Sequence, residues 1–512
     1  MSFDAVLVRL SRVMDNWGAW LVPLVTALLC VPFLQTLYWM GDEGLILGGA
    51  QRLIEGRRLY VDFFEVVPPL SFLATQAWLT VFGQTLISAR LLLVLLAALI
   101  AYFTYRSTRV VSQSSLLSGA MVLAWAAMWQ GGDTQLVHHW FSTALSSITL
   151  YALLLTPERK GPPLLAGIAA GAAMMATTTR GAYAVLAGLI IVGARRDFRS
   201  IMRFVAGAAI VPTLTLAYVL GHGELYAAID NLLVFAATRY SDVQGLKFGT
   251  FSSIQTRPLV LIFPAAAVLA VWTCYKNWPE VLKDDRFRAC CIFAVVGFVG
   301  CYPRPDTPHI IYNVPLALPL VGAGIARLRL SPRAAKIVGS VALCLVAPSL
   351  ASYAKRAWSV LRVQQVHTAA GPVRFISPQG EAALLRRIAT LPRTHRLTFY
   401  PYVPMMPFLS QRSQVSYVEA FVPGYTSPEL YARACRDTAD GASWVVIERS
   451  WTKPDMLWAI FPNLQEPQPR EKRMFEQALR HGFDLRAVIG NYELRQRASL
   501  KRSDCAAIVA NR

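Results

Sequence analysis

Long apolar segments dominate most of the chain. Stretches of about 16 to 22 mainly hydrophobic residues recur from Trp17 to Tyr353, and each has roughly the length that crosses a bilayer as an α-helix. From about Val360 onwards the sequence resembles that of an ordinary globular protein. The pattern predicts an α-helical polytopic membrane domain over residues 1–355, followed by a small α/β domain over residues 360–512. We expect about eleven spans, at residues 17–38, 86–105, 115–131, 138–155, 163–178, 180–194, 201–220, 257–275, 289–302, 309–326 and 335–353.

Basic residues gather in alternate loops between these segments. With a cytoplasmic N-terminus, every basic cluster obeys the positive-inside rule: Arg106/Arg109, Arg159/Lys160, Arg195/Arg196/Arg199, Lys276 to Arg288 and Arg327 to Lys336. The odd number of spans then places the C-terminal domain outside the cytoplasm. We therefore expect a multi-pass protein of the plasma (inner) membrane.

This topology requires residues 68–83 to form a helix at the membrane surface rather than a full crossing. Pro68-Pro69 suits a helix start, because proline lacks the amide hydrogen that has no partner there. Leu47, Ala50 and Ile54 share one face of an earlier amphipathic segment. The first external loop, residues 39–88, is therefore expected to carry two interfacial helices, and residues 225–236 repeat the amphipathic pattern.

The C-terminal domain alternates helical and strand-like stretches, at residues 379–391, 397–402, 427–438, 444–448, 470–481 and 485–495. It holds Cys435 and Cys505, while the other six cysteines lie in or beside apolar segments. A disulfide between Cys435 and Cys505 requires an oxidising compartment, and the sequence leaves their pairing open.

Composition excludes one class of partner. Hydrophobic residues make up 55% of the chain, and the formal net charge of +20 could suggest nucleic acid. Most of that excess lies in the short loops between spans, where basic residues act as topological anchors. We therefore expect the lipid bilayer, and not nucleic acid, to be the partner of the basic residues.

Candidate catalytic residues lie at the outer ends of the spans. Asp42 and Glu43 follow the first span, where ionisable groups are costly and usually functional, although a solvated pair that ends the helix is the alternative. The second external loop holds Asp133, His138 and His139. Adjacent helical residues point about 100° apart, so at most one of the two histidines should face a site, and packing is the alternative for each.

Arginines at the same side could bind phosphate. Arg180 follows three threonines in a tight external turn, and Arg304 opens a loop that also contains Asp306 and His309. Snorkelling to lipid is the alternative for Arg180, and an ion pair with Asp306 is the alternative for Arg304. Arg58 is a further external cation. A divalent cation held by Asp42, Asp133 and a histidine is conceivable, but no ligand spacing supports it and the chain contains no D-x-D motif.

The order of these features resembles the GT-C superfamily of membrane glycosyltransferases, especially the branch with protein O-mannosyltransferases and the lipid A aminoarabinose transferase. The resemblance is carried by Gly41-Asp42-Glu43-Gly44, the run from Ala50 to Gly56, Tyr60-Val61-Asp62-Phe63, Pro68-Pro69-Leu70, Phe82-Gly83 and Ala89-Arg90. Tyr400-Pro401-Tyr402, the run from Pro407 to Gln411 and Val422-Pro423-Gly424-Tyr425 add a weaker likeness in the C-terminal domain.

The resemblance implies an inverting hexosyl- or pentosyltransferase that acts outside the cytoplasm. It implies Asp42 as catalytic base, Glu43 as its supporting carboxylate and Asp133 as the second-loop acid, with Arg180, Arg304 and Arg58 as candidates for the donor phosphate. His138, His139, Asp306 and His309 are candidates for substrate or metal contacts. The donor would be a polyprenyl-phosphate sugar and the acceptor a lipid, a cell-envelope glycan or a protein, with no cofactor identified beyond the divalent cation left open above.

Three other functions fit some of these features. Many spans with polar groups also suit a transporter or flippase of a lipid-linked sugar, although no internal repeat and no charge deep in a span is found. An oligosaccharide ligase or polymerase would keep the enzyme class but change the donor. A binding protein that uses the spans as a scaffold is the third.

Overall fold

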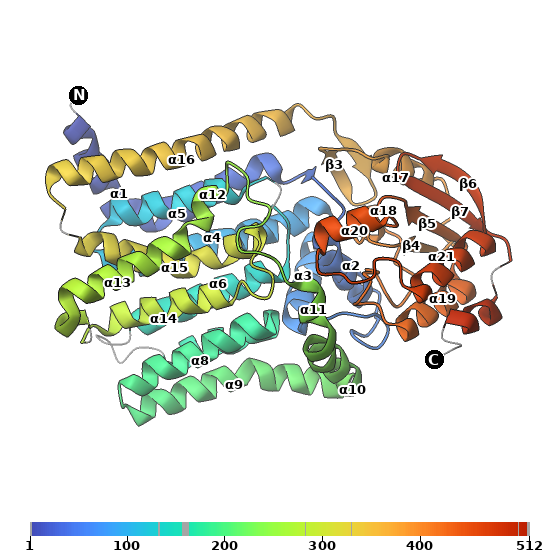
Figure 1. Ribbon diagram of the computed structural model, residues 1–512, viewed down its shortest axis with the longest axis horizontal. Coiled ribbons are helices and arrows are strands. Elements are labelled where there is room, and N and C mark those ends of the chain that lie inside the picture. Colours follow the sequence, from blue (N-terminus) through green and yellow to red (C-terminus); the bar gives the residue numbers. More distant parts are fainter. Residues whose placement is uncertain are drawn as a thin grey trace.

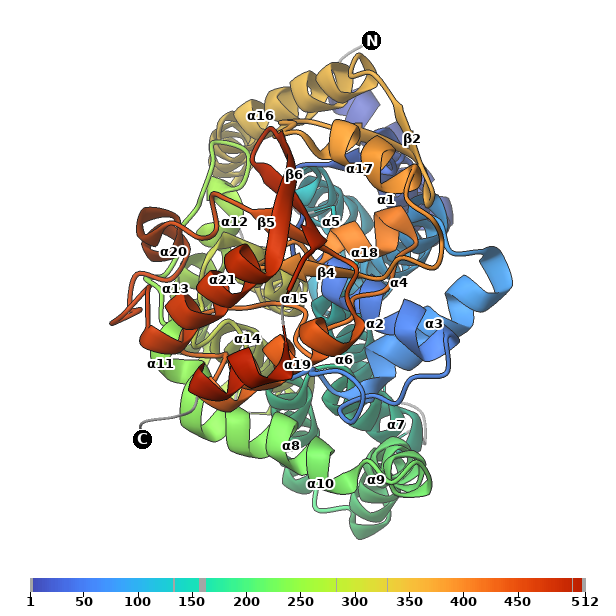
Figure 2. The same cartoon turned by 90° about the vertical axis from the view of Figure 1, so that its right-hand side faces the viewer.

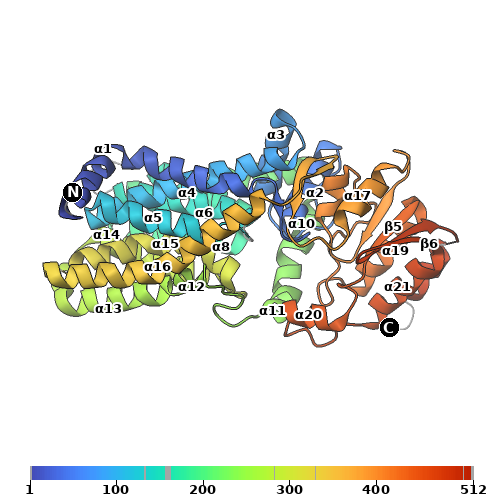
Figure 3. The same cartoon turned by 90° about the horizontal axis from the view of Figure 1, so that it is seen from above.

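The computed structural model describes residues 3–131, 134–155, 163–281, 283–328, 330–499 and 501–508. Long helices lie side by side and form a bundle, and an α/β part sits at one end of it (Figure 1). The N-terminus lies at the end of the bundle far from that part, as Figures 1 and 3 agree. The architecture is the polytopic helical fold with a small C-terminal α/β part that the hydrophobic pattern predicts.

A helix occupies each predicted span. The bundle helices are α1 (Phe3–Cys30), α4 (Leu86–Ser112), α5 (Ser115–Trp129), α6 (His138–Leu155), α7 (Pro163–Ala176), α8 (Thr178–Ala194), α9 (Phe198–Gly221), α13 (Ile262–Val281), α14 (Asp285–Val299), α15 (Thr307–Arg327) and α16 (Pro332–Leu361). Among the described residues, six helical stretches are long and apolar enough to cross a membrane, and α5, α7 and α8 are shorter apolar helices. The multi-pass membrane character is therefore confirmed.

The first predicted span differs from α1 at both ends. The helix begins at Phe3 rather than Trp17 and ends at Cys30 rather than Tyr38. Pro32 lies in the first turn of a short 3₁₀ helix (Val31–Phe33), and strand β1 (Thr36–Leu37) follows. Since proline removes a helical hydrogen bond and clashes with the preceding turn, the apolar run continues here while the α-helix does not.

Small residues let bundle helices approach closely. A Cβ on Gly167 of α7 would lie 2.1 Å from the Phe204 carbonyl oxygen of α9, and one on Gly171 would lie 2.3 Å from that of Ala208. Glycines four residues apart on one helix face are typical of close helix pairs in membranes. Helices α9 and α16 lie on opposite outer sides of the bundle (Figure 2).

Short helices cover the end of the bundle that faces the α/β part. The first external loop forms α2 (Glu43–Ile54) and α3 (Pro69–Phe82), and α3 projects from the side of the molecule (Figure 3). Residues 225–244 form α10 (Leu225–Ile229), two π-helical turns η2 (Asp230–Val234) and η3 (Ala236–Tyr240), and α11 (Ser241–Gln244). The two helices predicted in the first loop are present, but α2 is buried on nearly all sides, because both α3 and the C-terminal part pack against it.

A four-stranded mixed sheet forms the centre of the C-terminal part, in the order β4-β5-β7-β6. Its strands are β4 (Leu397–Tyr400), β5 (Trp444–Glu448), β6 (Phe483–Ile489) and β7 (Tyr492–Arg497), with β4 and β5 parallel and the other pairs antiparallel. The predicted strand-like stretch 485–495 is a hairpin, because Gly490 adopts a positive φ of 58° at its turn. The helices around the sheet are α17 (Glu381–Ala389), α18 (Met405–Ser410), α19 (Pro428–Gly441), α20 (Pro454–Ile460) and α21 (Arg470–Gly482).

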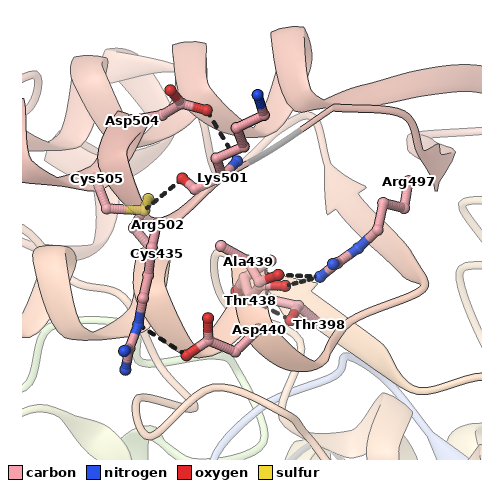
Figure 4. Close-up of a disulfide and its surroundings, with 10 residues drawn as sticks. All are labelled: Thr398, Cys435, Thr438, Ala439, Asp440, Arg497, Lys501, Arg502, Asp504 and Cys505. Atoms are coloured by element: carbon pink, nitrogen blue, oxygen red, sulfur yellow. Dashed lines mark hydrogen bonds and ion pairs between the residues drawn. A yellow bond between two sulfur atoms is a disulfide. The ribbon is translucent and has the colours of Figure 1, made fainter.

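Two long-range links join distant segments of the chain. β1 pairs in parallel with β3 (Gly371–Phe375), which also pairs with β2 (Val366–Thr368), so the segment after α1 joins the segment after α16. Within the C-terminal part, Cys435 of α19 forms a disulfide with Cys505 of the 3₁₀ helix η4 (Arg502–Ile508) (Figure 4). The pairing that the sequence left open is therefore present, and the other six cysteines are free.

Candidate active site

Asp42 lies at the end of the bundle, just before the first turn of α2, with its side chain exposed. Its carboxylate accepts a hydrogen bond from the hydroxyl of Tyr402, which comes from the segment between β4 and α18. Asp42 does not cap α2 with its own side chain. The carboxylate is therefore accessible and held by a residue of the C-terminal part.

Aromatic rings surround this hydrogen bond. The ring of Tyr402 stacks on Trp39 at 6.2 Å and packs against Trp451 at 4.7 Å. Burial, followed by the adjacent charge of Asp42, raises the pKa of Tyr402 well above its usual range. Tyr402 consequently remains protonated and donates its hydroxyl hydrogen to the carboxylate.

The contacts of Glu43 hold the fold together. Its side chain is 1% exposed and accepts two hydrogen bonds of 2.6 Å from Arg90 of α4. Glu43 also accepts a hydrogen bond of 2.9 Å from the backbone amide of Leu136, in the second external loop. A single buried carboxylate therefore ties α4 and the second loop to the start of α2, directly beside Asp42.

The C-terminal part packs tightly on α2. A Cβ on Gly44 would lie 2.2 Å from the backbone of Pro404 and Met405, so only glycine permits this contact between α2 and α18. Further along α2, the Arg52 guanidinium lies 3.8 Å from Glu419, and both side chains are 1% exposed. Ala420, next to Glu419, forms a β-bridge with Tyr402, close to Pro404. The C-terminal residues that contact Gly44 and Arg52 of α2 are therefore joined to each other.

The loop before α15 forms a second polar group. Arg304 donates to Asp306 at 2.7 Å and to Gln244 at 2.7 Å, and its guanidinium lies 5.4 Å from the ring centre of Phe461. Asp306 also accepts a hydrogen bond from the ring of His309 at 2.6 Å. Burial alone would raise the pKa of Asp306, but the contacts with His309 and Arg304 outweigh it and lower that pKa. The ion pair considered in the sequence is therefore present.

Arg180 is buried inside the bundle. Its guanidinium donates to the side chains of Asn313, Ser142 and Thr143 and to the carbonyl oxygens of His139 and Tyr312. A guanidinium has five N–H donors, and these contacts use all three of its nitrogens. Arg180 thus joins α6, α8 and α15 and, contrary to the sequence prediction, leaves no donor for a phosphate.

The two histidines of α6 have adjacent rings, with centres 3.9 Å apart, but each makes different further contacts. His138 hydrogen-bonds to the Thr177 hydroxyl at 2.9 Å. The ring of His139 contacts those of His309 and Tyr312 at 4.9 and 5.0 Å. Packing therefore accounts for His138, while His139 joins the Asp306 and His309 group.

Arg58 lies apart from this geometry. Arg58 is exposed and forms an ion pair with Asp62 at 3.3 Å on the first external loop, so its contacts are those of a surface cation. Asp133 lies outside the described residues. Within the described parts of the chain, no group of three or more His, Cys, Asp and Glu side chains could hold a metal ion.

Several contributors were missed from the sequence. Tyr402, Trp451 and Glu419 contribute from the C-terminal part. The weaker likeness over Tyr400-Pro401-Tyr402 included Tyr402 without a role, and no local pattern marks Trp451 or Glu419. Arg90, which has no predicted role in the site, is the buried partner of Glu43. The signal that could have identified Arg90 is its position in an apolar helix, where a cation requires a counter-charge.

Comparison with known proteins connects this geometry to a fold. No protein-family model and no curated protein sequence matches the chain. Two crystal structures of ArnT from Cupriavidus metallidurans, one bound to undecaprenyl phosphate and one in the apo state, each match with a TM-score of 0.54. Their sequence identities are 15% and 14%, and each match covers 97% of this chain and 100% or 99% of the ArnT chain.

A third solved structure adds a more distant match. The arabinofuranosyltransferase AftD from Mycobacteria matches with a TM-score of 0.51 at 15% identity, over 94% of this chain and 40% of AftD. The ArnT matches extend over nearly the whole of both chains and include the helical bundle and the C-terminal part together. The chain therefore has the fold of the GT-C superfamily of membrane glycosyltransferases.

Proposed function

We propose that this protein is a glycosyltransferase that moves a single sugar from a polyprenyl-phosphate donor to an acceptor outside the cytoplasm, with inversion. The observation that carries the proposal is the exposed carboxylate of Asp42, held by Tyr402 at the covered end of a GT-C fold. The match to ArnT bound to undecaprenyl phosphate supports a polyprenyl-phosphate carrier.

Asp42 acts as the general base in this proposal. Direct displacement at the anomeric carbon needs a group that removes the proton of the acceptor hydroxyl while that oxygen attacks. Since Asp42 is exposed, an acceptor oxygen can reach it, and the hydrogen bond from Tyr402 fixes the carboxylate in one orientation. Glu43 supports Asp42 indirectly, by fixing the backbone of α2 and of the second loop.

Arg304 is the proposed contact for the departing phosphate. Breakage of the bond between the sugar and the phosphate leaves negative charge that a guanidinium can stabilise. Arg304 uses three of its five N–H donors, on Asp306, Gln244 and the Ile460 carbonyl oxygen. The guanidinium of Arg304 lies over the ring of Phe461, which belongs to the same apolar cluster as Tyr402, the hydrogen-bond donor to Asp42.

The proposal also includes a residue of the second external loop and a divalent cation. The backbone amide of Leu136 donates to Glu43, the sequence neighbour of Asp42. Asp133, which precedes Leu136 in the second external loop, is proposed as the second acid on the sequence resemblance alone. A divalent cation at the phosphate stays a prediction, to be tested by chelation.

The test is release of polyprenyl phosphate from a panel of short-chain polyprenyl-phosphate hexoses and pentoses by the protein in lipid nanodiscs. The wild-type protein should release the lipid phosphate, and Asp42→Asn should release it at least about 100-fold more slowly. Asp62→Asn is the matched control, because Asp62 is an exposed acid of the same loop, and it should retain the rate.

Other outcomes would contradict the proposal. Equal release by wild type and Asp42→Asn would remove Asp42 as the base. No release from any monosaccharide donor, together with movement of the intact lipid-linked sugar across a vesicle bilayer, would identify a transporter. Turnover only of lipid-linked oligosaccharides would identify a ligase or polymerase.

A further inference from the structure

A cavity of about 290 Å³ lies between the external segment after α10 and the C-terminal part. The external segment contributes the residues of one wall: Asp230, Asn231, Val234, Phe235, Thr238 and Arg239. Across the cavity lie Phe64 of the first external loop and, from the C-terminal part, Tyr417, Glu429 and Arg433. Three segments that are far apart in the sequence therefore enclose one space outside the Asp42 region.

The wall from the external segment has an unusual backbone. Asp230, Asn231 and Val234 lie in the π-helical turn η2, and Thr238 and Arg239 lie in the next one, η3. Phe235 connects the two turns. Wide helical turns of this kind are rare and occur frequently at functional sites. All residues that this segment gives to the cavity thus come from the two π turns or from the residue between them.

The side chains around the cavity combine rings with charges of both signs. Phe64 packs against Phe235 at 5.6 Å and against Tyr417 at 6.1 Å. Arg433 is held by a hydrogen bond of 3.0 Å to the Val61 carbonyl oxygen, with its guanidinium 3.4 Å from the ring centre of Tyr417. The opposite wall carries Asp230 and Arg239, both exposed.

This lining favours one chemical class of ligand. Each wall carries one acidic and one basic residue, so an anion or a cation would meet a like charge on both sides. An acyl chain would exclude solvent from these charged groups and offer them no hydrogen bond in return. A neutral sugar ring can donate to the carboxylates, accept from the guanidinium groups and pack its C–H face on the rings. The volume, at the small end of about 300 to 1,000 Å³ for ligand pockets, suits one such ring.

The position of the cavity suits a ligand close to the membrane surface and to Asp42. Leu225, Ile229 and Leu233, on the same external segment, are 37, 44 and 58% exposed, which is typical of a helix that contacts lipid. Towards the Asp42 region, Phe235 packs against Tyr425 at 5.4 Å. Tyr425 in turn packs against the apolar cluster that contains Tyr402.

We propose that this cavity binds a neutral sugar ring of the acceptor, so that the acceptor is a glycan or glycolipid rather than an unmodified protein. The inference rests on the proposed transferase function and narrows its acceptor. In this arrangement the ring occupies the cavity while another hydroxyl of the same acceptor reaches Asp42.

Binding of a panel of methyl hexosides and methyl pentosides to the full-length protein in nanodiscs tests the site, measured by saturation-transfer NMR. Wild type should bind at least one member. Thr238→Trp, which fills the cavity from an exposed position, should abolish that signal, and Asp230→Asn and Arg239→Gln should each weaken binding about tenfold. Arg257→Gln, which removes an exposed arginine that does not line the cavity, is the control and should bind as wild type does.

The same variants separate this inference from the proposed function. Asp42→Asn should bind the glycoside as well as wild type does, because Asp42 does not line the cavity. Binding that Thr238→Trp abolishes, in a protein that releases no polyprenyl phosphate, would keep the sugar site and remove the transfer reaction. No binding by wild type, equal binding by Thr238→Trp, or turnover by Thr238→Trp with an unchanged acceptor KM would overturn the sugar site.

Discussion

The Tyr402 hydroxyl donates a hydrogen bond to Asp42, although the two residues lie 360 positions apart in the sequence. Asp42 belongs to the end of the bundle and Tyr402 to the C-terminal part, so the candidate base is completed only when the two parts are packed together. The contact gives the C-terminal part a direct influence on the proposed chemistry.

Removal of that hydrogen bond should slow transfer without unfolding the protein. In Tyr402→Phe the ring still packs on Trp39 and Trp451, but Asp42 loses the donor that orients it. We expect kcat to fall about tenfold or more with little change in thermal stability, measured by polyprenyl phosphate release and a melting curve. Tyr353→Phe, which loses a bond to the Leu29 carbonyl oxygen, is the control, and an equal loss of kcat in it would contradict the assignment.

Neutralising Glu43 should destabilise the fold. Glu43→Gln leaves the Arg90 guanidinium buried without a counter-charge, and loss of one partner of a buried pair typically costs about 3 to 5 kcal/mol of the free energy of unfolding. The melting temperature in nanodiscs should fall accordingly. Glu466→Gln disrupts an exposed pair with Arg473 and should change stability by less than about 1 kcal/mol. A small effect of both variants would show that the Glu43–Arg90 pair is unimportant for stability.

The free energy of unfolding should decrease as pH rises, because of Glu419. Burial raises the pKa of Glu419 to about 7, although the nearby Arg52 and Arg57 lower it. Because the folded state favours protonated Glu419, its contribution to the free energy of unfolding is fully present below the usual Glu pKa of 4.5 and is lost as pH rises through about 7.

Glu419→Gln should therefore flatten the pH dependence of the melting temperature. Between pH 4.5 and about 7, the wild-type protein should lose about 3 kcal/mol more of its free energy of unfolding than Glu419→Gln loses. Some slope should remain, since burial also raises the pKa of neighbouring Glu65. An unchanged slope in Glu419→Gln would show that another group controls it.

The disulfide should stabilise the C-terminal part. It closes a loop with a sequence separation of 70, for which the chain-entropy relation gives about 4 kcal/mol. Reduction, or the double change Cys435→Ser and Cys505→Ser, should lower the melting temperature by similar amounts. Alkylation of the denatured, unreduced protein should label six cysteines and, after reduction, eight. Eight labels without reduction would show that the bond is absent from the purified protein.

Much of the architecture could be predicted from local sequence. Hydrophobic length determined where the bundle helices lie, because a span is recognised from its own residues alone. Pro68-Pro69 predicted the start of α3. The position of Asp42 and Glu43 after the first span led to the end of the bundle where the candidate site is proposed. The predicted bounds were wrong where a single residue interrupts a run. Pro32 ends the helix within the first apolar run, and Gly490 forms a turn within the predicted strand.

The tertiary structure alone decided which polar groups can act. Sequence treated Asp42 and Glu43 as a pair, yet packing exposes one and buries the other against Arg90. The sequence treated Arg180 and Arg304 alike, yet Arg180 uses its N–H donors inside the bundle, while Arg304 uses three of its five. The physical reason is that periodicity and charge describe a residue's own segment, whereas burial and hydrogen-bond partners depend on segments hundreds of residues away.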